Sequence, residues 1–195
     1  MTAESDASST SGQAGMAWSR QKTLATVASP WVTVYAEQWC DDSGNILDYW
    51  RVDRPDSVIV LPIHRGNFLL PPPVFRPGIG RATWDFPGGR LPADLAPHEA
   101  VCTVLKRELG VKADHRTEQR ALNEEPWAVD SSFSSQRLWG FVAVLDDNYS
   151  LDARRLGASV PATTDGAKHL LSRLHCLQCR ALLMEWLVQS MREEG

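Results

Sequence analysis

The distribution of apolar residues in the first third of the chain predicts strands. Residues 31–39 alternate apolar and polar side chains, which is the two-residue period of a half-buried strand. A turn-forming cluster at 41–45 separates this segment from a second strand at 46–52, so we expect the two to form a hairpin. Residues 57–63 are a continuous apolar run, which indicates a buried strand.

The rest of the chain predicts two helices and a further strand. Residues 97–109 have Pro97 at a first-turn position and Gly110 directly after the last turn, which are ordinary start and stop signals of a helix. Residues 138–145 are an apolar strand. A long C-terminal helix is expected over about 165–192, packed on the domain's own sheet or presented to a partner through a stripe at helical spacing: Leu170, Leu174, Leu177, Ala181, Met184 and Val188.

Length and composition favour one folded domain. The chain has 195 residues, enough for a sizeable core. Residues 1–17 are mostly Ser, Ala, Thr and Gly, so we expect a disordered segment followed by one domain over 18–195. The formal charge of −4 gives no basic footprint for nucleic acid or a membrane surface. No apolar run could span a bilayer and no targeting signal is recognisable, so we expect a cytoplasmic protein.

The cysteines and tryptophans are expected to pack in the core more often than to bind a metal or a ligand. Four irregularly spaced cysteines argue against a disulfide framework. Cys176 and Cys179 form a CxxC, but no second Cys/His pair stands at ligand spacing, so we expect small apolar residues in or beside the core. Most of the eight tryptophans are expected in the core, and the candidates for stacking on an adenine ring are Trp39, Trp50 and Trp127.

The candidate chemistry lies in the segment that begins Asp85-Phe86-Pro87-Gly88-Gly89-Arg90 and ends at Val111. This segment resembles the signature of the Nudix hydrolases, G-x5-E-x7-R-E-U-x-E-E-x-G-U, in which U is a bulky aliphatic residue. Aligned from Gly89, the box covers residues 89–111 and matches at Leu105, Glu108, Gly110 and Val111. Four positions depart from the signature: Leu95 replaces the first Glu, Thr103 the Arg, and Val104 and Arg107 two further Glu residues.

A second alignment, shifted by four residues, matches Glu99, Arg107 and Glu108 to the E-x7-R-E part of the signature. It places Val111 on a paired-Glu position and ignores Gly110, which reads as a helix stop. We prefer the first alignment. Glu108 is the one acidic ligand position common to both.

The resemblance implies an α/β/α sandwich with a mixed sheet, and a helix whose carboxylates hold Mg²⁺ or Mn²⁺ for the hydrolysis of a diphosphate. These hard cations require several oxygen ligands. Glu108 is the retained acid of the box, and hence the one candidate for catalysis and for metal binding, whereas Arg107 brings a positive charge beside the cation. Acids outside the box that could complete a site are Asp94, Glu124, Glu125 and Asp130.

A wider resemblance covers about residues 31–145. A hairpin, an apolar strand, Arg76-Pro77 and then the box follow one another in an order similar to that of ADP-ribose and nucleoside-diphosphate-sugar diphosphatases. Those enzymes often carry a Pro-Gly-Phe-Ser stretch near a catalytic Glu. This chain retains Phe133 and Ser134 but has Gln136 near the expected acid, and an amide cannot act as a general base.

Three functions follow from this pattern. The first is a binding or regulatory module for a nucleoside diphosphate derivative of the ADP-ribose type, with weak or no hydrolysis, in which phosphates contact Arg76, Gly88, Gly89, Arg90 and Arg107. The second is an active Mg²⁺- or Mn²⁺-dependent hydrolase that uses Glu108 and acids outside the box. The third is a structural subunit that contacts a partner through its C-terminal helix. The resemblance also implies a homodimer.

Overall fold

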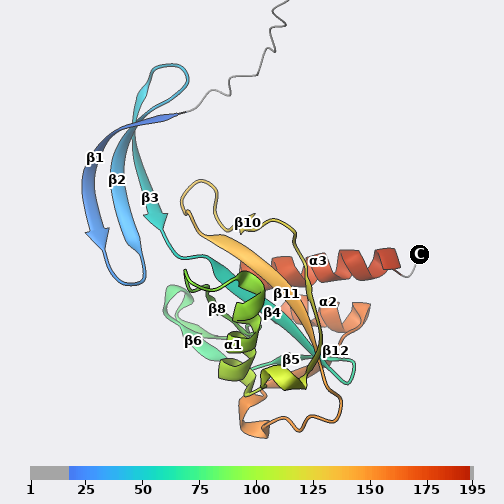
Figure 1. Ribbon diagram of the computed structural model, residues 1–195. Helices are drawn as coiled ribbons and strands as arrows, with labels where there is room; N and C mark the ends of the chain where they lie inside the picture. Colours follow the sequence, from blue (N-terminus) through green and yellow to red (C-terminus); the bar gives the residue numbers. More distant parts are fainter. Residues whose placement is uncertain (1–17, 194–195) are drawn as a thin grey trace, which may run out of the picture.

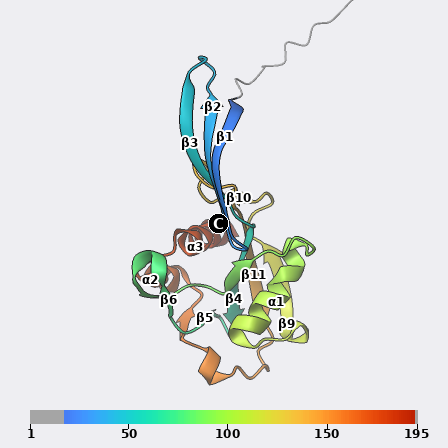
Figure 2. The same cartoon turned by 90° about the vertical axis from the view of Figure 1, so that its left-hand side faces the viewer.

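The structure is a computed structural model that describes residues 18–193, so the segment 1–17 lies outside the described residues. It begins with a three-stranded antiparallel sheet that projects from the body (Figures 1 and 2), made of β1 (Ser19–Ala28), β2 (Thr33–Cys40) and β3 (Ile46–Asp53). The predicted hairpin is confirmed as β2 and β3. We did not expect β1, because its polar and weakly apolar residues are exposed along its whole length and so carry no burial pattern.

The body is built on a seven-stranded sheet in which β10, β11, β4, β5 and β12 lie in that order, while β8 pairs with β4 and β9 with β11. β4 and β11 are parallel and the other pairs are antiparallel, so the sheet is mixed. A separate hairpin joins β6 (Val74–Arg76) to β7 (Arg81–Thr83). The seven strands are β4 (Ser57–His64), β5 (Asn67–Leu70), β8 (Gly88–Arg90), β9 (Arg116–Ala121), β10 (Trp127–Ala128), β11 (Arg137–Leu145) and β12 (Ala158–Pro161).

Helices cover both faces of this sheet (Figure 2). The helix α1 (Pro97–Leu109) lies on one face, and α2 (Thr164–Arg173) and α3 (Leu177–Glu193) lie on the other. In β4, Val58 and Val60 pack with the cluster under α1, whereas Ile59 and Leu61 pack with the cluster under α2 and α3. Burial of both faces explains why this segment is apolar throughout. The predicted α/β/α sandwich is confirmed.

The single C-terminal helix that we expected is wrong, because a short link separates α2 from α3. Leu174 adopts an extended conformation at the end of α2. The Arg180 guanidinium of α3 donates to the carbonyl oxygens of Leu171 and Leu174, and so satisfies acceptors that a helix end leaves without partners. The link also changes which side of the second helix packs on the sheet: Cys179, Leu182, Leu183 and Trp186 are buried, while Leu177, Met184 and Val188 are exposed.

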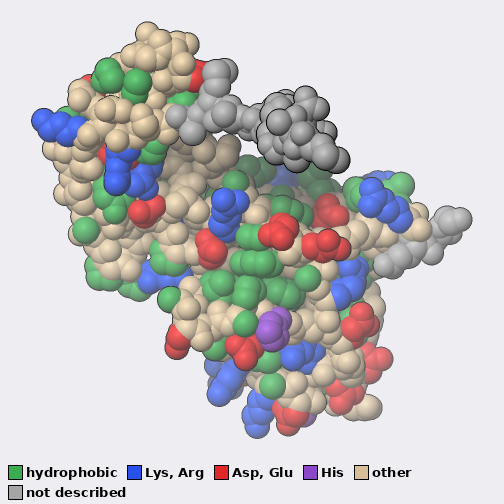
Figure 3. Space-filling view, turned by 45° about the horizontal axis from the view of Figure 1, so that its top comes forward, with side chains coloured by type: hydrophobic (Ala, Val, Ile, Leu, Met, Phe, Trp, Pro, Cys, Tyr) green, Lys and Arg blue, Asp and Glu red, His purple; other side chains and the backbone are tan. Residues whose placement is uncertain are grey.

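The projecting sheet carries several exposed apolar side chains, which appear as separate green areas on that part of the surface in Figure 3. They include Val27, Trp31, Ile46 and Trp50. A loop of the body anchors this sheet, because the Val52 amide donates to the Phe133 carbonyl at 2.8 Å. Within residues 18–193 no helix is long and apolar enough to cross a membrane.

Candidate functional site

A cleft of about 710 Å³ opens between the β6–β7 hairpin, β8, the end of α1 and the start of α3. The five residues that we predicted to contact phosphates all line this cleft: Arg76, Gly88, Gly89, Arg90 and Arg107. They come from three separate elements, β6, β8 and α1. The fold therefore brings into one cleft residues that lie in separate segments of the sequence.

Arg107 lies against the Gly88–Gly89 strand. Its Nη2 donates to the Gly88 carbonyl oxygen at 2.7 Å, and its Nε donates to Oε1 of Glu108 at 2.8 Å. A Cβ atom at position 89 would lie 2.6 Å from that Nη2, so the guanidinium fits here because residue 89 is glycine. Five N–H groups are available on a guanidinium, and these two contacts leave others for an anion in the cleft.

Arg76 and Arg90 are fixed by partners at the edge of the cleft. Arg76 Nε donates to Oδ2 of Asp85 at 2.7 Å. The Arg90 guanidinium lies 4.3 Å from the centre of the Trp31 ring, a cation–π arrangement. Trp31 lines the cleft, whereas the three tryptophans that we considered for stacking do not: Trp39 bonds Glu37, Trp50 is exposed and Trp127 packs against the core.

The helix boundaries fit the first alignment of the box. α1 ends at Leu109, and Gly110 has a left-handed conformation with φ of 75°, so the shifted alignment would carry its paired-Glu positions beyond the helix. Glu99, which we expected at the surface or at the helix start, accepts from the Ala96 amide at 3.0 Å and so caps the helix.

Two of the four box positions that depart from the signature lie in apolar surroundings. Val104 is buried in the core cluster under α1, and Leu95 packs against the same cluster. Thr103 is exposed on the outer side of the helix. Only Arg107, among the four departures from the signature, reaches the cleft.

The residues around Glu108 do not fit a Mg²⁺ or Mn²⁺ site. Its carboxylate is paired with Arg107, and within residues 18–193 the one group of three or more His, Cys, Asp or Glu ligand atoms close enough to share an ion does not include it. The candidate acids outside the box do not line the cleft either: Asp94, Glu124, Glu125 and Asp130. Hard cations need several oxygen ligands, and the described side chains gather one here.

Gln136 occupies the neighbourhood where the family resemblance places an acid. It is buried, lines the cleft and donates from Nε2 to the Pro55 carbonyl oxygen at 3.2 Å. Its Oε1 is buried and finds no hydrogen-bond partner in the part of the chain that the structure describes. The side chain offers an amide to the cleft and no general base.

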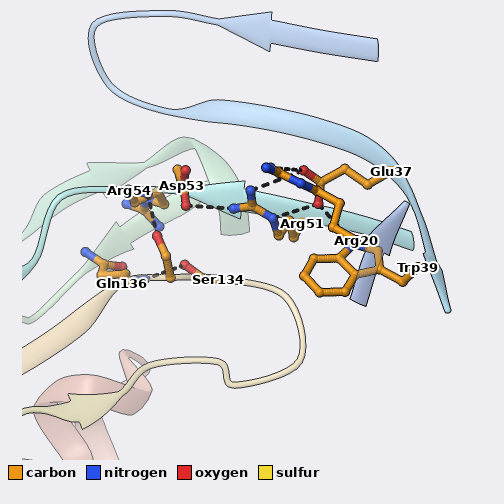
Figure 4. A network of polar contacts seen from close by, with 9 residues as sticks. Arg20, Glu37, Trp39, Arg51, Asp53, Arg54, Ser134 and Gln136 are labelled. Atoms are coloured by element: carbon orange, nitrogen blue, oxygen red, sulfur yellow. Dashed lines mark hydrogen bonds and ion pairs between the residues drawn. The ribbon is translucent and has the colours of Figure 1, made fainter. Parts of the chain in front are cut away.

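A buried carboxylate holds the projecting sheet together (Figure 4). Glu37 of β2 has no exposed surface and accepts from Arg51 Nε at 2.9 Å, from Trp39 Nε1 at 3.0 Å and from Arg20 at 3.3 Å. The hydrogen bond from Arg51, with smaller contributions from Trp39 and Arg20, lowers the pKa of Glu37. Sequence reasoning missed this network, because a Glu within a strand ordinarily faces solvent.

The CxxC lies at the wall of the cleft. As expected, Cys179 is part of the core and Cys176 packs against it. Sequence reasoning did not anticipate that Asp85 approaches both thiols, with ligand atoms of all three residues within 4.8 Å of one another. A hydrogen bond from the Cys179 thiol lowers the pKa of Cys176 to about 6, and the same contact together with burial raises the pKa of Cys179.

Comparison with solved structures identifies the fold. The chain is similar to a protein whose structure is described as that of an ADP compounds hydrolase, with a TM-score of 0.72 and 18% sequence identity, over 91% of this chain and 96% of that chain. No family model matches the sequence, and no curated protein does. The chain has the Nudix fold that its box and the order of its strands predicted.

Proposed function

We propose that this protein is a Nudix-fold module that binds a nucleoside diphosphate derivative of the ADP-ribose type, with weak or no hydrolysis. The observation that carries this proposal is the position of Arg107 on the Gly88–Gly89 strand, in one cleft with Arg76 and Arg90. Guanidinium groups recognise phosphate oxygens through paired, charge-assisted hydrogen bonds. The cleft volume of about 710 Å³ lies within the range of roughly 300–1,000 Å³ that small-molecule sites occupy.

In this proposal a guanidinium takes the place of a metal ion. A Mg²⁺ ion placed at Glu108 would lie beside the positive charge of Arg107, which already occupies one carboxylate oxygen. Two unit charges about 4 Å apart repel by roughly 4 kcal/mol at an effective dielectric constant of about 20, and a divalent ion roughly doubles that figure. Arg107 can donate charge-assisted hydrogen bonds to a diphosphate without a metal ion, but it cannot activate a water molecule for attack. Binding without efficient hydrolysis follows.

The alternative function is a Mg²⁺- or Mn²⁺-dependent hydrolase. The likeness of the fold to an ADP compounds hydrolase favours it, and Glu108 is the residue that would be required. Product analysis separates the two functions: the full chain is incubated with ADP-ribose, NADH, sugar nucleotides and nucleoside triphosphates in Mg²⁺ or Mn²⁺. We expect no efficient turnover of this panel. AMP formed rapidly from ADP-ribose by the wild type, and lost in Glu108→Gln, would overturn the proposal in favour of the hydrolase.

A structural role with a homodimer or another partner on the C-terminal helix is favoured by one feature of α3. Its outer side exposes Leu177, Met184, Val188 and Met191, with between 44% and 72% of each residue accessible. Light scattering of the purified chain tests this role. A dimer that dissociates in Met184→Lys and Val188→Lys, with a cleft that binds no nucleotide, would favour the structural subunit over the binding module.

A further inference from the structure

Three side chains outside the phosphate-facing set meet at the base of the cleft. Asp85 follows β7, Cys176 ends the link between α2 and α3, and Cys179 lies in the first turn of α3. Their ligand atoms lie within 4.8 Å of one another. We propose that Asp85, Cys176 and Cys179 form a binding site for a soft divalent cation of the zinc class. The three residues lie outside residues 89–111 of the Nudix box, but they line the same cleft as the proposed phosphate contacts.

The geometry suits such an ion. Zinc–sulfur bonds are about 2.3 Å long, so the ligands of a tetrahedral site lie about 3.8 Å apart. The three atoms need to move inward by little to reach that spacing. Two cysteines separated by two residues are a common pair of zinc ligands, and here the break in the helix places both on the same side of the start of α3.

Asp85 is already oriented as a ligand. Its Oδ2 accepts from Arg76 at 2.7 Å from Nε and 2.5 Å from Nη2. Its Oδ1 is buried and has no hydrogen-bond partner among residues 18–193. A buried carboxylate oxygen without a partner is costly, and a cation would supply that partner. Arg76 would then act as an outer partner that fixes the ligating carboxylate, as is usual around protein metal sites.

The donor set selects the kind of cation. Two thiolates and one carboxylate favour zinc and similar soft ions over Mg²⁺, which prefers oxygen ligands alone. Two thiolates and one carboxylate also bring three negative charges, which a divalent ion and the Arg76 guanidinium together balance. All three residues line the cleft, so a water molecule or a ligand oxygen can reach the fourth position from that side.

The test uses the full chain, reduced and freed of metal by a chelator, and titrated with Co²⁺ as a spectroscopic stand-in for Zn²⁺. We expect thiolate-to-cobalt charge-transfer absorption that saturates at one equivalent and disappears when Zn²⁺ is added. Cys176→Ser should lose most of this absorption and bind Zn²⁺ at least about 100-fold more weakly. Loss of an outer partner of a metal site already costs up to about 100-fold in affinity, and Cys176 is a direct ligand in this proposal. Asp85→Asn should weaken Zn²⁺ binding but keep the thiolate absorption.

Cys40→Ser is the matched control, because Cys40 lies on β2 away from the cleft and should leave Zn²⁺ affinity unchanged. Circular dichroism verifies the fold of each variant, and Cys176→Ser replaces a half-buried thiol where the fully buried Cys179 would be harder to change. Two results would overturn the site: no metal bound by the reduced wild type, or equal Zn²⁺ affinity of the wild type and Cys176→Ser.

Discussion

At the scale of single residues, the proposed function depends most on residue 107. The Nudix signature has a glutamate there, whereas this chain has an arginine whose guanidinium donates to the Gly88 carbonyl oxygen. The carboxylate of the neighbouring Glu108 forms an ion pair with this guanidinium. In the proposed function, an arginine here both takes the place of one carboxylate ligand of the signature and pairs with another, so the cleft would bind an anion in preference to a cation.

Gly89→Ala should weaken binding of ADP-ribose, because the new Cβ would displace the Arg107 guanidinium that now lies 2.6 Å from its position. We expect the dissociation constant to rise about 10-fold, since a hydrogen bond to a charged group contributes roughly 1.5–3 kcal/mol and 1.4 kcal/mol is a factor of ten. Calorimetric titration measures it. Gly78→Ala is the control, because Gly78 lines the same cleft and a Cβ there meets nothing within 4 Å. Equal affinity of both variants would refute the assigned position of Arg107.

Glu37 should make the stability of the protein depend on acid. Its pKa in the folded protein lies below the ordinary value of 4.5, so its ion pairs contribute fully above that pH and are lost as the pH falls through the folded value. Glu37→Gln should lower the free energy of unfolding by about 1.5–3 kcal/mol at pH 7, the range for loss of a hydrogen bond to a charged group. Urea unfolding followed by tryptophan fluorescence should show this difference shrink below pH 4.5. A difference that stays constant with pH would contradict the role given to the Glu37 charge.

At the scale of elements, local signals located α1 but not the break before α3. Pro97 and Gly110 are start and stop residues whose effect depends on the adjacent backbone, so the sequence predicted the bounds of that helix. The end of α2 depends instead on Arg180, which reaches back from the next helix to carbonyl oxygens of α2. The apolar spacing through 174–176 continues as if one helix were present, and it gives no sign of such a tertiary contact.

The close contact between β11 and α3 should make residue 140 sensitive to substitution. A Cβ on Gly140 would lie 1.7 Å from Cδ2 of Leu182, so this strand and helix are close enough to require glycine. Gly140→Ala should lower the free energy of unfolding by about 1–3 kcal/mol, the usual cost of overpacking a core. Chemical denaturation measures the free energy of unfolding. Gly78→Ala is the control for a glycine-to-alanine change where the new Cβ has open space. Unchanged stability in Gly140→Ala would mean that α3 packs less closely than described.

At the scale of the whole molecule, the sequence predicted the sandwich and five of the residues that line the cleft, but Glu108, the predicted catalytic residue, does not line it. Arg76 and Gly89 could be placed because the box and the Arg-Pro keep a familiar order. Trp31 could not, because it reaches the cleft through the packing of segments far apart in the chain. The approach of Asp85 to Cys176 and Cys179 has the same origin. β1 was missed for the opposite reason, since an exposed strand in a projecting sheet has no apolar pattern to detect.

The most direct test of the account is the affinity of the purified chain for ADP-ribose in the presence of a chelator, measured by calorimetric titration for the wild type and for Arg107→Glu. We predict that the wild type binds without a divalent cation, that Arg107→Glu weakens binding by at least about 10-fold through the loss of charge-assisted hydrogen bonds, and that Glu108→Gln binds nearly as well as the wild type. Binding that requires Mg²⁺ or Mn²⁺ and is lost in Glu108→Gln would contradict the account, because the metal and not Arg107 would then hold the diphosphate.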